Sequence, residues 1–110
     1  MWLVDPELMC RNHLLGEHLE LHILASCLNE GKGIAGFIEY GLVDPSLLFN
    51  RHELLVKEMK KRGYRHYSPI GKLPDRLDRG HVDPGDNIEA LAARCDQCRR
   101  RIESGKGSEN

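Results

Sequence analysis

A histidine and two glutamates recur at helical spacing near the start of the chain, within the run HLLGEHLELH at residues 13–22. At 100° per residue, Glu17 lies about 40° and Glu20 about 20° from His13 around a helix axis. We therefore expect these side chains on one stripe, where a histidine and carboxylates can act as a general acid–base pair. A solvent-facing helix shows the same pattern opposite an apolar stripe, so both interpretations stay open.

Two further sets of side chains have the spacing of metal ligands. His18 and His22 stand four apart, but the sequence offers no third ligand beside them. Cys95 and Cys98 form half of a zinc site, and Cys10 with His13 would supply the other half if the first and last helices pack together. We expect reduced thiols and no cofactor. The alternative is zinc at Cys10, His13, Cys95 and Cys98, which would compete with a catalytic role for His13.

Three helices are expected to position these groups. The first opens at Asp5-Pro6 and runs to about Asn29, either as one helix or as a short turn followed by a long helix. The second opens at Asp44-Pro45 and stops at Gly63. The third runs from about Asp86 to about Ile102. No strand pattern is present, which predicts an all-α fold.

The segments between these helices have loop composition. Residues 31–36 are glycine-rich and residues 64–85 hold three prolines and many charges, so both are expected to be irregular. We expect residues 104–110 to be a disordered tail. The sequence thus predicts a compact single domain over residues 1–103, with three main helices and irregular connections.

The charge of the 110-residue chain is nearly balanced but unevenly distributed. The formal net charge is −1, with −5 in residues 1–50 and +4 in residues 51–110. This asymmetry favours a basic face in the second half or two halves that attract each other, and both remain open. No apolar run is long enough to cross a bilayer and no signal peptide is evident, so we expect a cytoplasmic protein, acting as a monomer.

Two runs resemble the pyrimidine-dimer glycosylase family of the phage endonuclease V type. Residues 10–21, CRNHLLGEHLEL, look like that family's catalytic helix, whose pattern is approximately His-Leu-x-small-Glu-(aromatic or His)-x-Glu-Leu. Residues 51–64, RHELLVKEMKKRGY, look like its second long helix. The resemblance covers roughly residues 1–70. It implies a DNA-repair enzyme that acts on double-stranded DNA with a damaged or abasic nucleotide.

The resemblance also implies a mechanism, that of an N-glycosylase with AP-lyase (endonuclease) activity on pyrimidine dimers. The nucleophile would be the α-amine of Met1, which the bulky Trp2 should protect from removal, and it would form a Schiff base with the sugar. Glu20 would be the acid/base and His13 would position the sugar or a phosphate. An α-amine has a pKa of about 7.7–8.0 against about 10.4 for lysine, so a larger fraction is neutral near pH 7.

The chain departs from the family pattern where the family carries arginines. Leu3, Leu19 and Ile23 occupy those places. This departure motivates an alternative, a non-catalytic DNA- or protein-binding helical module, possibly zinc-stabilised. If the chain is an enzyme, we expect substitute cations from Arg11, Lys57, Lys60, Lys61, Arg62 and Arg65. Glu17 is a further candidate contact to the substrate.

Overall fold

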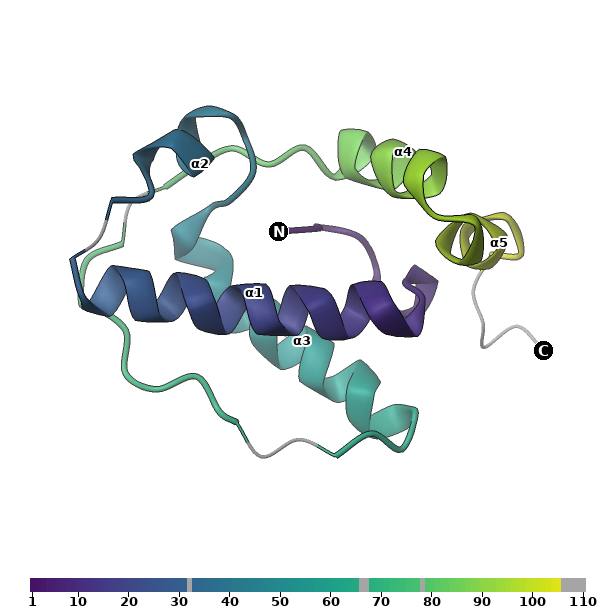
Figure 1. Ribbon diagram of the computed structural model, residues 1–110, viewed down its shortest axis with the longest axis horizontal. Coiled ribbons are helices and arrows are strands. Elements are labelled where there is room, and N and C mark those ends of the chain that lie inside the picture. The colour runs from purple at the N-terminus through teal and green to yellow at the C-terminus, as the bar shows by residue number, and fades with distance from the viewer. Residues whose placement is uncertain (32, 66–67, 78, 106–110) are drawn as a thin grey trace.

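In the computed structural model, the described part of the chain is all-α and contains no strand (Figure 1). It comprises residues 1–31, 33–65, 68–77 and 79–105. The predicted fold class is confirmed. Of the predicted tail, Ser104 and Gly105 end the last helix, and residues 106–110 lie outside the described residues.

The first predicted helix is a short turn followed by a long helix. A 3-10 helix, η1 (Pro6–Leu8), is capped by Asp5, whose carboxylate accepts the Glu7 N–H at 3.0 Å. Helix α1 (Arg11–Asn29) follows and runs along the long axis of the molecule (Figure 1). The aspartate–proline pair therefore sets the first turn, as expected from the capping and N1 preferences of these residues.

The second predicted helix begins in the same way. Asp44 caps the 3-10 helix η2 (Pro45–Leu47), and α3 (Leu48–Lys61) continues from it. Gly63, at φ 84°, ends this helix in the left-handed conformation that glycine adopts most easily. The predicted stop is confirmed.

Helices α1 and α3 pack together and form the core. Leu14 and Leu21 of α1 and Leu48 and Leu55 of α3 have no solvent exposure. Burying each leucine contributes roughly 1.5–3 kcal/mol, so this seam fixes the two helices against each other. Leu54 of α3 is exposed.

The third predicted helix is two helices, so the expectation of one continuous element is wrong. Helix α4 (Pro84–Arg94) ends where Cys95 takes an extended conformation, and α5 (Asp96–Glu103) starts directly after it. The Cys95 sulfur accepts the Cys98 N–H and so caps α5. The start of α4 also lies earlier than predicted, because Asp83 and Pro84 form a third capped turn.

One further helix lies in a segment expected to be irregular. Helix α2 (Ala35–Glu39) begins inside the glycine-rich stretch and ends at Tyr40. The connection from α3 to α4 passes around the C-terminal end of α1, where the Asn29 side chain donates to Lys72 O at 3.1 Å (Figure 1). Gly80 then passes so close to Val43 that a Cβ atom would lie 2.3 Å from the Val43 carbonyl oxygen. Glycine is therefore required there.

Two ion pairs join the acidic first half of the sequence to the basic second half. Arg51 pairs with Glu17 at 2.7 Å, and Lys61 pairs with Glu7 at 3.0 Å. Both pairs join a base from the second half to an acid from the first. No helix in the described part of the chain combines the length and apolar character needed to span a membrane.

Candidate active site

The amino group of Met1 lies against the side chain of Glu20. Its nitrogen donates to Glu20 Oε1 at 2.6 Å and to the Leu42 carbonyl oxygen at 2.9 Å. The Met1 side chain is fully buried, whereas that of Glu20 is 45% exposed. The buried Met1 side chain and the two hydrogen bonds hold the amine in place, and the Glu20 carboxylate stays accessible to a ligand.

Two further contacts hold the N-terminal segment in place. Arg51 donates to the Val4 carbonyl oxygen at 2.8 Å from α3, and the Leu3 N–H donates to the Asn87 side chain at 2.9 Å on α4. Residues 1–4 therefore run between α1 and α4, with the chain start near the middle of α1 (Figure 1). Because helices on both sides bind this segment, the amine has a fixed position above α1.

A cavity of about 790 Å³ opens beside the amine, within the size range of small-molecule sites. Its walls come from α1, α2, α4 and the segments before and after them, and five of its residues are large apolar side chains that are at least half exposed: Leu19, Ile23, Phe37, Tyr40 and Leu42. Gly16, one turn before Glu20, also lines it, and a Cβ atom there would meet nothing within 4 Å. The cavity is therefore open, mostly apolar and partly aromatic.

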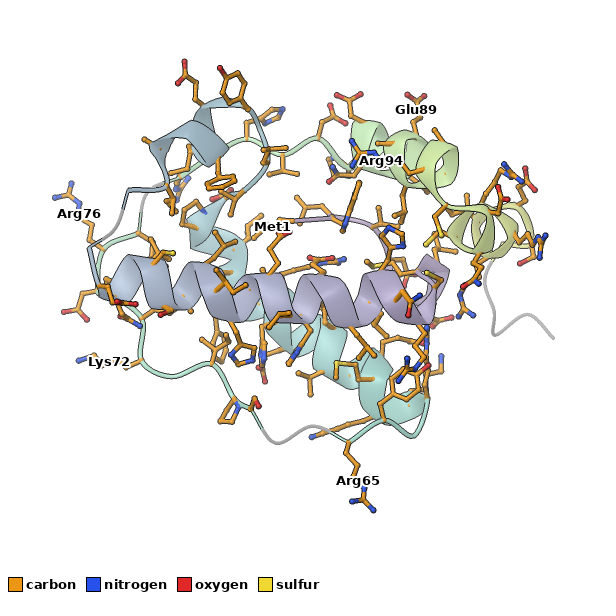
Figure 2. The ribbon with its side chains drawn as sticks, in the orientation of Figure 1. Met1, Arg65, Lys72, Arg76, Glu89 and Arg94 are labelled. Carbon is orange, nitrogen blue, oxygen red and sulfur yellow. The ribbon has the colours of Figure 1, made fainter. Side chains whose placement is uncertain are left out.

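The cavity carries little positive charge. Leu19 and Ile23, which occupy the family's arginine positions, line it. Among the described lining residues, Arg94 is the one lysine or arginine, and its guanidinium lies 5.6 Å from the centre of the Trp2 ring. Arg94 and Met1 lie on the same side of α1 (Figure 2). This arginine, in the C-terminal part of the chain, was not among the residues expected from the sequence.

Of the predicted site residues, Met1 and Glu20 line the cavity and the others do not. Glu17 is fully buried and accepts two hydrogen bonds from Arg51, at 2.7 and 2.9 Å. The expectation that Glu17 shares a stripe with Glu20 does not hold, because it lies about 60° from Glu20 but only about 40° from Leu21 around the helix. It faces the core, where it supports the packing of α1 on α3.

The predicted cations also lie away from the amine. Arg62 donates to Glu58 and to the carbonyl oxygens of Pro6 and Met9, at 2.7, 3.1 and 2.7 Å. The hydrogen bond to Glu7 raises the pKa of Lys61. Arg65 and Met1 lie on opposite sides of α1 (Figure 2).

Arg11 and Arg62 instead line a second hollow of about 430 Å³, together with Arg100 and Arg101. Arg11 stacks over Tyr64 there, with 5.5 Å from its guanidinium carbon to the ring centre. Lys60 is an exposed side chain of the last turn of α3. None of the predicted cations therefore lines the amine cavity, so none is in position to bind a phosphate there.

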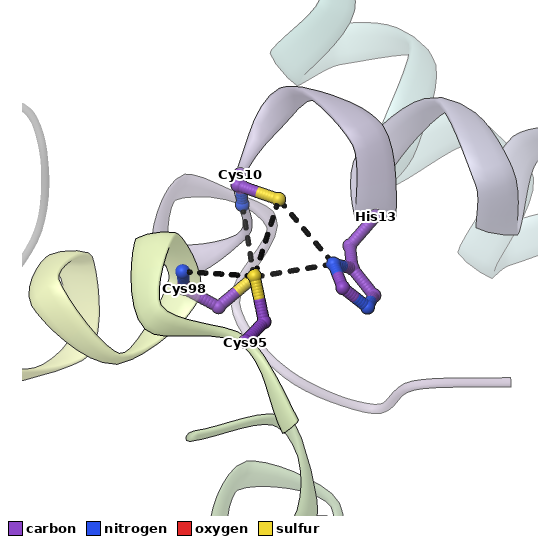
Figure 3. Close-up of side chains that lie close together, drawn as sticks. All are labelled: Cys10, His13, Cys95 and Cys98. Carbon is purple, nitrogen blue, oxygen red and sulfur yellow. Dashed lines mark hydrogen bonds between the residues drawn. The ribbon is translucent and has the colours of Figure 1, made fainter. Parts of the chain in front are cut away.

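His13 faces a cluster of cysteines rather than the cavity (Figure 3). Its Nδ1 lies 3.3 Å from Cys10 Sγ and 3.6 Å from Cys98 Sγ, and Cys10 Sγ lies 3.8 Å from Cys95 Sγ. Burial raises the pKa of the Cys98 thiol to about 12, while the Cys98 N–H lowers the pKa of Cys95. The residues of the alternative zinc site are thus brought together, and the role of His13 in positioning a sugar stays a prediction.

A second cluster joins His18 and His22 to His52 of α3. The three donor atoms lie within 4.8 Å of one another, and the Nε2 atoms of His18 and His52 are 3.2 Å apart. His52 Nδ1 lies 2.7 Å from a carboxylate oxygen of Glu53. The arrangement suits either a hydrogen bond between the rings or a metal ion. The third histidine was missed because its neighbourhood depends on how α3 crosses α1.

One of three comparisons with known proteins found a match. Searches of curated proteins and of solved structures gave no match. A family model described as pyrimidine dimer DNA glycosylase matches residues 1–71 of the 110 in the chain. The match includes Met1, Glu20 and Leu42 and leaves out α4 and α5. The chain belongs to the pyrimidine dimer DNA glycosylase family.

Proposed function

We propose that the chain is a DNA N-glycosylase with AP-lyase activity, in which the α-amine of Met1 attacks the sugar of a damaged nucleotide. Membership of the family carries the repair assignment. The contact of 2.6 Å between the Met1 nitrogen and Glu20 is the observation that supports this nucleophile. An amine on the floor of an open cavity, beside a half-exposed carboxylate, is what such chemistry requires.

The first step forms a bond between the Met1 nitrogen and C1′ and breaks the bond from C1′ to the base, whose electron pair leaves with the base. The nitrogen must first lose a proton, and Glu20 is the carboxylate already bound to it. Glu20 accepts this proton and passes it to the ring oxygen, so that the sugar opens to a Schiff base and the carboxylate is regenerated. Glu20 also stabilises the positive charge that develops on the sugar and serves as the base for strand cleavage by elimination.

The apolar walls of the cavity suit a nucleotide taken out of the helix. The reacting carbon is hidden in stacked DNA, so the duplex must kink and extrude a nucleotide. Phe37 and Tyr40 line the cavity and offer aromatic surface on which a base can stack. Arg94 lines the same cavity, and we propose that it binds a flanking phosphate in place of the family's arginines.

A second candidate function is a non-catalytic binding module on the same scaffold. The apolar side chains around the cavity, with Arg94 as the one lysine or arginine among its described lining residues, favour it. Such a module would keep its DNA or protein binding after the carboxylate at position 20 is lost. Catalysis by the amine would not survive that change.

The test is strand cleavage of two duplexes, one with a single cyclobutane pyrimidine dimer and one with a single abasic site. We expect the unmodified protein to cleave both, and acetylation of the amino terminus to stop both reactions because the acylated nitrogen is no longer nucleophilic. Cleavage of the abasic duplex alone would retain the lyase and reject the glycosylase. Full activity after complete acetylation would reject the amine as nucleophile.

A further inference from the structure

We propose that Cys10, His13, Cys95 and Cys98 bind one zinc ion, which ties the C-terminal helices to the catalytic helix. The four side chains come from the start of α1 and from the junction of α4 and α5 (Figure 3). Their donor atoms all lie within 4.8 Å of one another. Three sulfurs and one imidazole nitrogen form a ligand set that tetrahedral structural zinc prefers.

Three of the six distances between donor atoms lie close to those around a tetrahedral ion. Bonds of about 2.3 Å to sulfur and about 2.0–2.1 Å to nitrogen place two sulfurs about 3.8 Å apart and a sulfur and nitrogen about 3.6 Å apart. Cys10 Sγ lies 3.8 Å from Cys95 Sγ, and Cys98 Sγ lies 3.6 Å from His13 Nδ1. Cys10 Sγ and His13 Nδ1 are slightly closer, at 3.3 Å. The side chains need little movement to accept the ion.

Backbone donors support the sulfurs as zinc-bound thiolates. The Cys10 N–H donates to Cys98 Sγ at 3.2 Å, and the Cys98 N–H donates to Cys95 Sγ at 3.4 Å. Such N–H···S bonds stabilise the negative charge of thiolate ligands and fix their orientation. Three thiolates around Zn²⁺ leave one negative charge, and the neighbouring hollow holds Arg11, Arg100 and Arg101 to offset it.

The position of the cluster gives the ion a definite task. Two ligands come from residues 1–71, which match the family, and two from the remainder of the chain. Helix α4 carries Asn87, which binds the N-terminal segment, and Arg94, which lines the amine cavity. Zinc would therefore hold in place a wall of the active site that the family model does not include. His13 would be a ligand and not a substrate contact.

Metal analysis of tag-free protein purified without chelator tests this proposal. We expect about one zinc per chain in the unmodified protein and in Cys27→Ser, the matched control, because Cys27 is the cysteine outside the cluster. Cys95→Ser should lose the zinc, and so should Cys98→Ser. His22→Gln should keep it. Zinc lost with His22→Gln and kept in both cysteine variants would place the metal at the histidines and overturn the proposal.

Cobalt replacement gives a second readout that does not depend on how the variants fold. Co²⁺ added to the chelator-treated unmodified protein should give thiolate-to-metal charge-transfer absorption and the strong visible bands of a tetrahedral ion. Visible bands without charge transfer would mean a site without cysteine. A Cys95–Cys98 disulfide with no bound metal would equally contradict the proposal. These outcomes are independent of DNA cleavage, so the zinc site and the proposed enzyme fail separately.

Amide hydrogen exchange tests whether zinc attaches α4 and α5 to α1. Removing zinc should increase amide hydrogen exchange in residues 84–103, because α4 and α5 lose their attachment to α1. Exchange at the α1–α3 seam should change less. Equal exchange over residues 84–103 with and without zinc would overturn the proposed link between these helices.

Discussion

Two glutamates three positions apart on α1 occupy opposite environments. Glu17 is fully buried and bound by the Arg51 guanidinium, whereas Glu20 is 45% exposed and bound by the chain's own amino group. Both are acids in one helix, and each is paired with one positive charge. They differ in whether solvent and a ligand can reach the carboxylate. A buried pair contributes to the packing of α1 on α3, while a pair at the edge of a cavity can exchange its partner for a substrate.

The largest expected effect comes from the exposed member of this comparison. Glu20→Gln keeps the size of the side chain and removes its ability to accept a proton. We expect strand cleavage at an abasic site to fall by about 10²–10⁴-fold, the usual contribution of a general acid–base group. Single-turnover cleavage measures it. An unchanged midpoint of thermal unfolding would show that the loss is chemical.

The buried member should respond in the opposite way. Glu17→Ala leaves the Arg51 charge without its buried partner, and we expect the free energy of unfolding to fall by about 3–5 kcal/mol. Urea unfolding at pH 7 measures this loss. If Glu17→Ala kept the stability of the parent protein and lost cleavage as strongly as Glu20→Gln, the assignment of a structural role to Glu17 and a catalytic role to Glu20 would be contradicted.

Introducing arginines at the two α1 positions where the family pattern has them should strengthen DNA binding. Leu19 and Ile23 are 61% and 55% exposed beside the cavity, so Leu19→Arg with Ile23→Arg should reach phosphates without disturbing the core. The slope of log K against log salt should steepen by about 0.9 for each phosphate that the new arginines neutralise. Binding titrations with an abasic duplex at several salt concentrations measure the slope. An unchanged slope would mean that DNA does not approach this side of α1.

The smallest effect is expected at Gly16, also on the cavity side. Nothing lies within 4 Å of a Cβ atom there, so Gly16→Ala should raise the free energy of unfolding by about 1 kcal/mol through helix propensity. The added methyl group would narrow the cavity that Gly16 lines, and cleavage should slow modestly. Lower stability in urea unfolding would show that the position is more tightly packed than the fold indicates.

The helices that follow local rules could be predicted from the sequence. Asp5-Pro6 and Asp44-Pro45 mark turns that the structure confirms, and Gly63 ends α3 as expected. The break at Cys95 could not be predicted from periodicity, because it depends on the contact of that sulfur with the start of α5 and with α1. The Asp83-Pro84 pair carries the same local signal for the start of α4.

The residues of the candidate site also fall into two groups, those that the sequence predicted and those whose positions depend on tertiary contacts. Met1 and Glu20 came from the family resemblance, and the structure brings them together. Arg94 and Asn87 could not be assigned, since their contacts with Trp2 and Leu3 depend on how α4 packs against residues 1–4. Glu17 was misplaced because a stripe about 60° wide on a helix can include one residue that faces the core and another that faces solvent.

The most direct test of the proposed nucleophile is reduction with borohydride during reaction with abasic-site DNA. Borohydride converts a Schiff base into a stable amine, so we expect a covalent protein–DNA product whose linkage maps to the nitrogen of Met1 by peptide mass spectrometry. Glu20→Gln should give much less of it. A linkage at a lysine, or no covalent product from folded protein, would contradict the assignment of the chain's own amino group as the nucleophile.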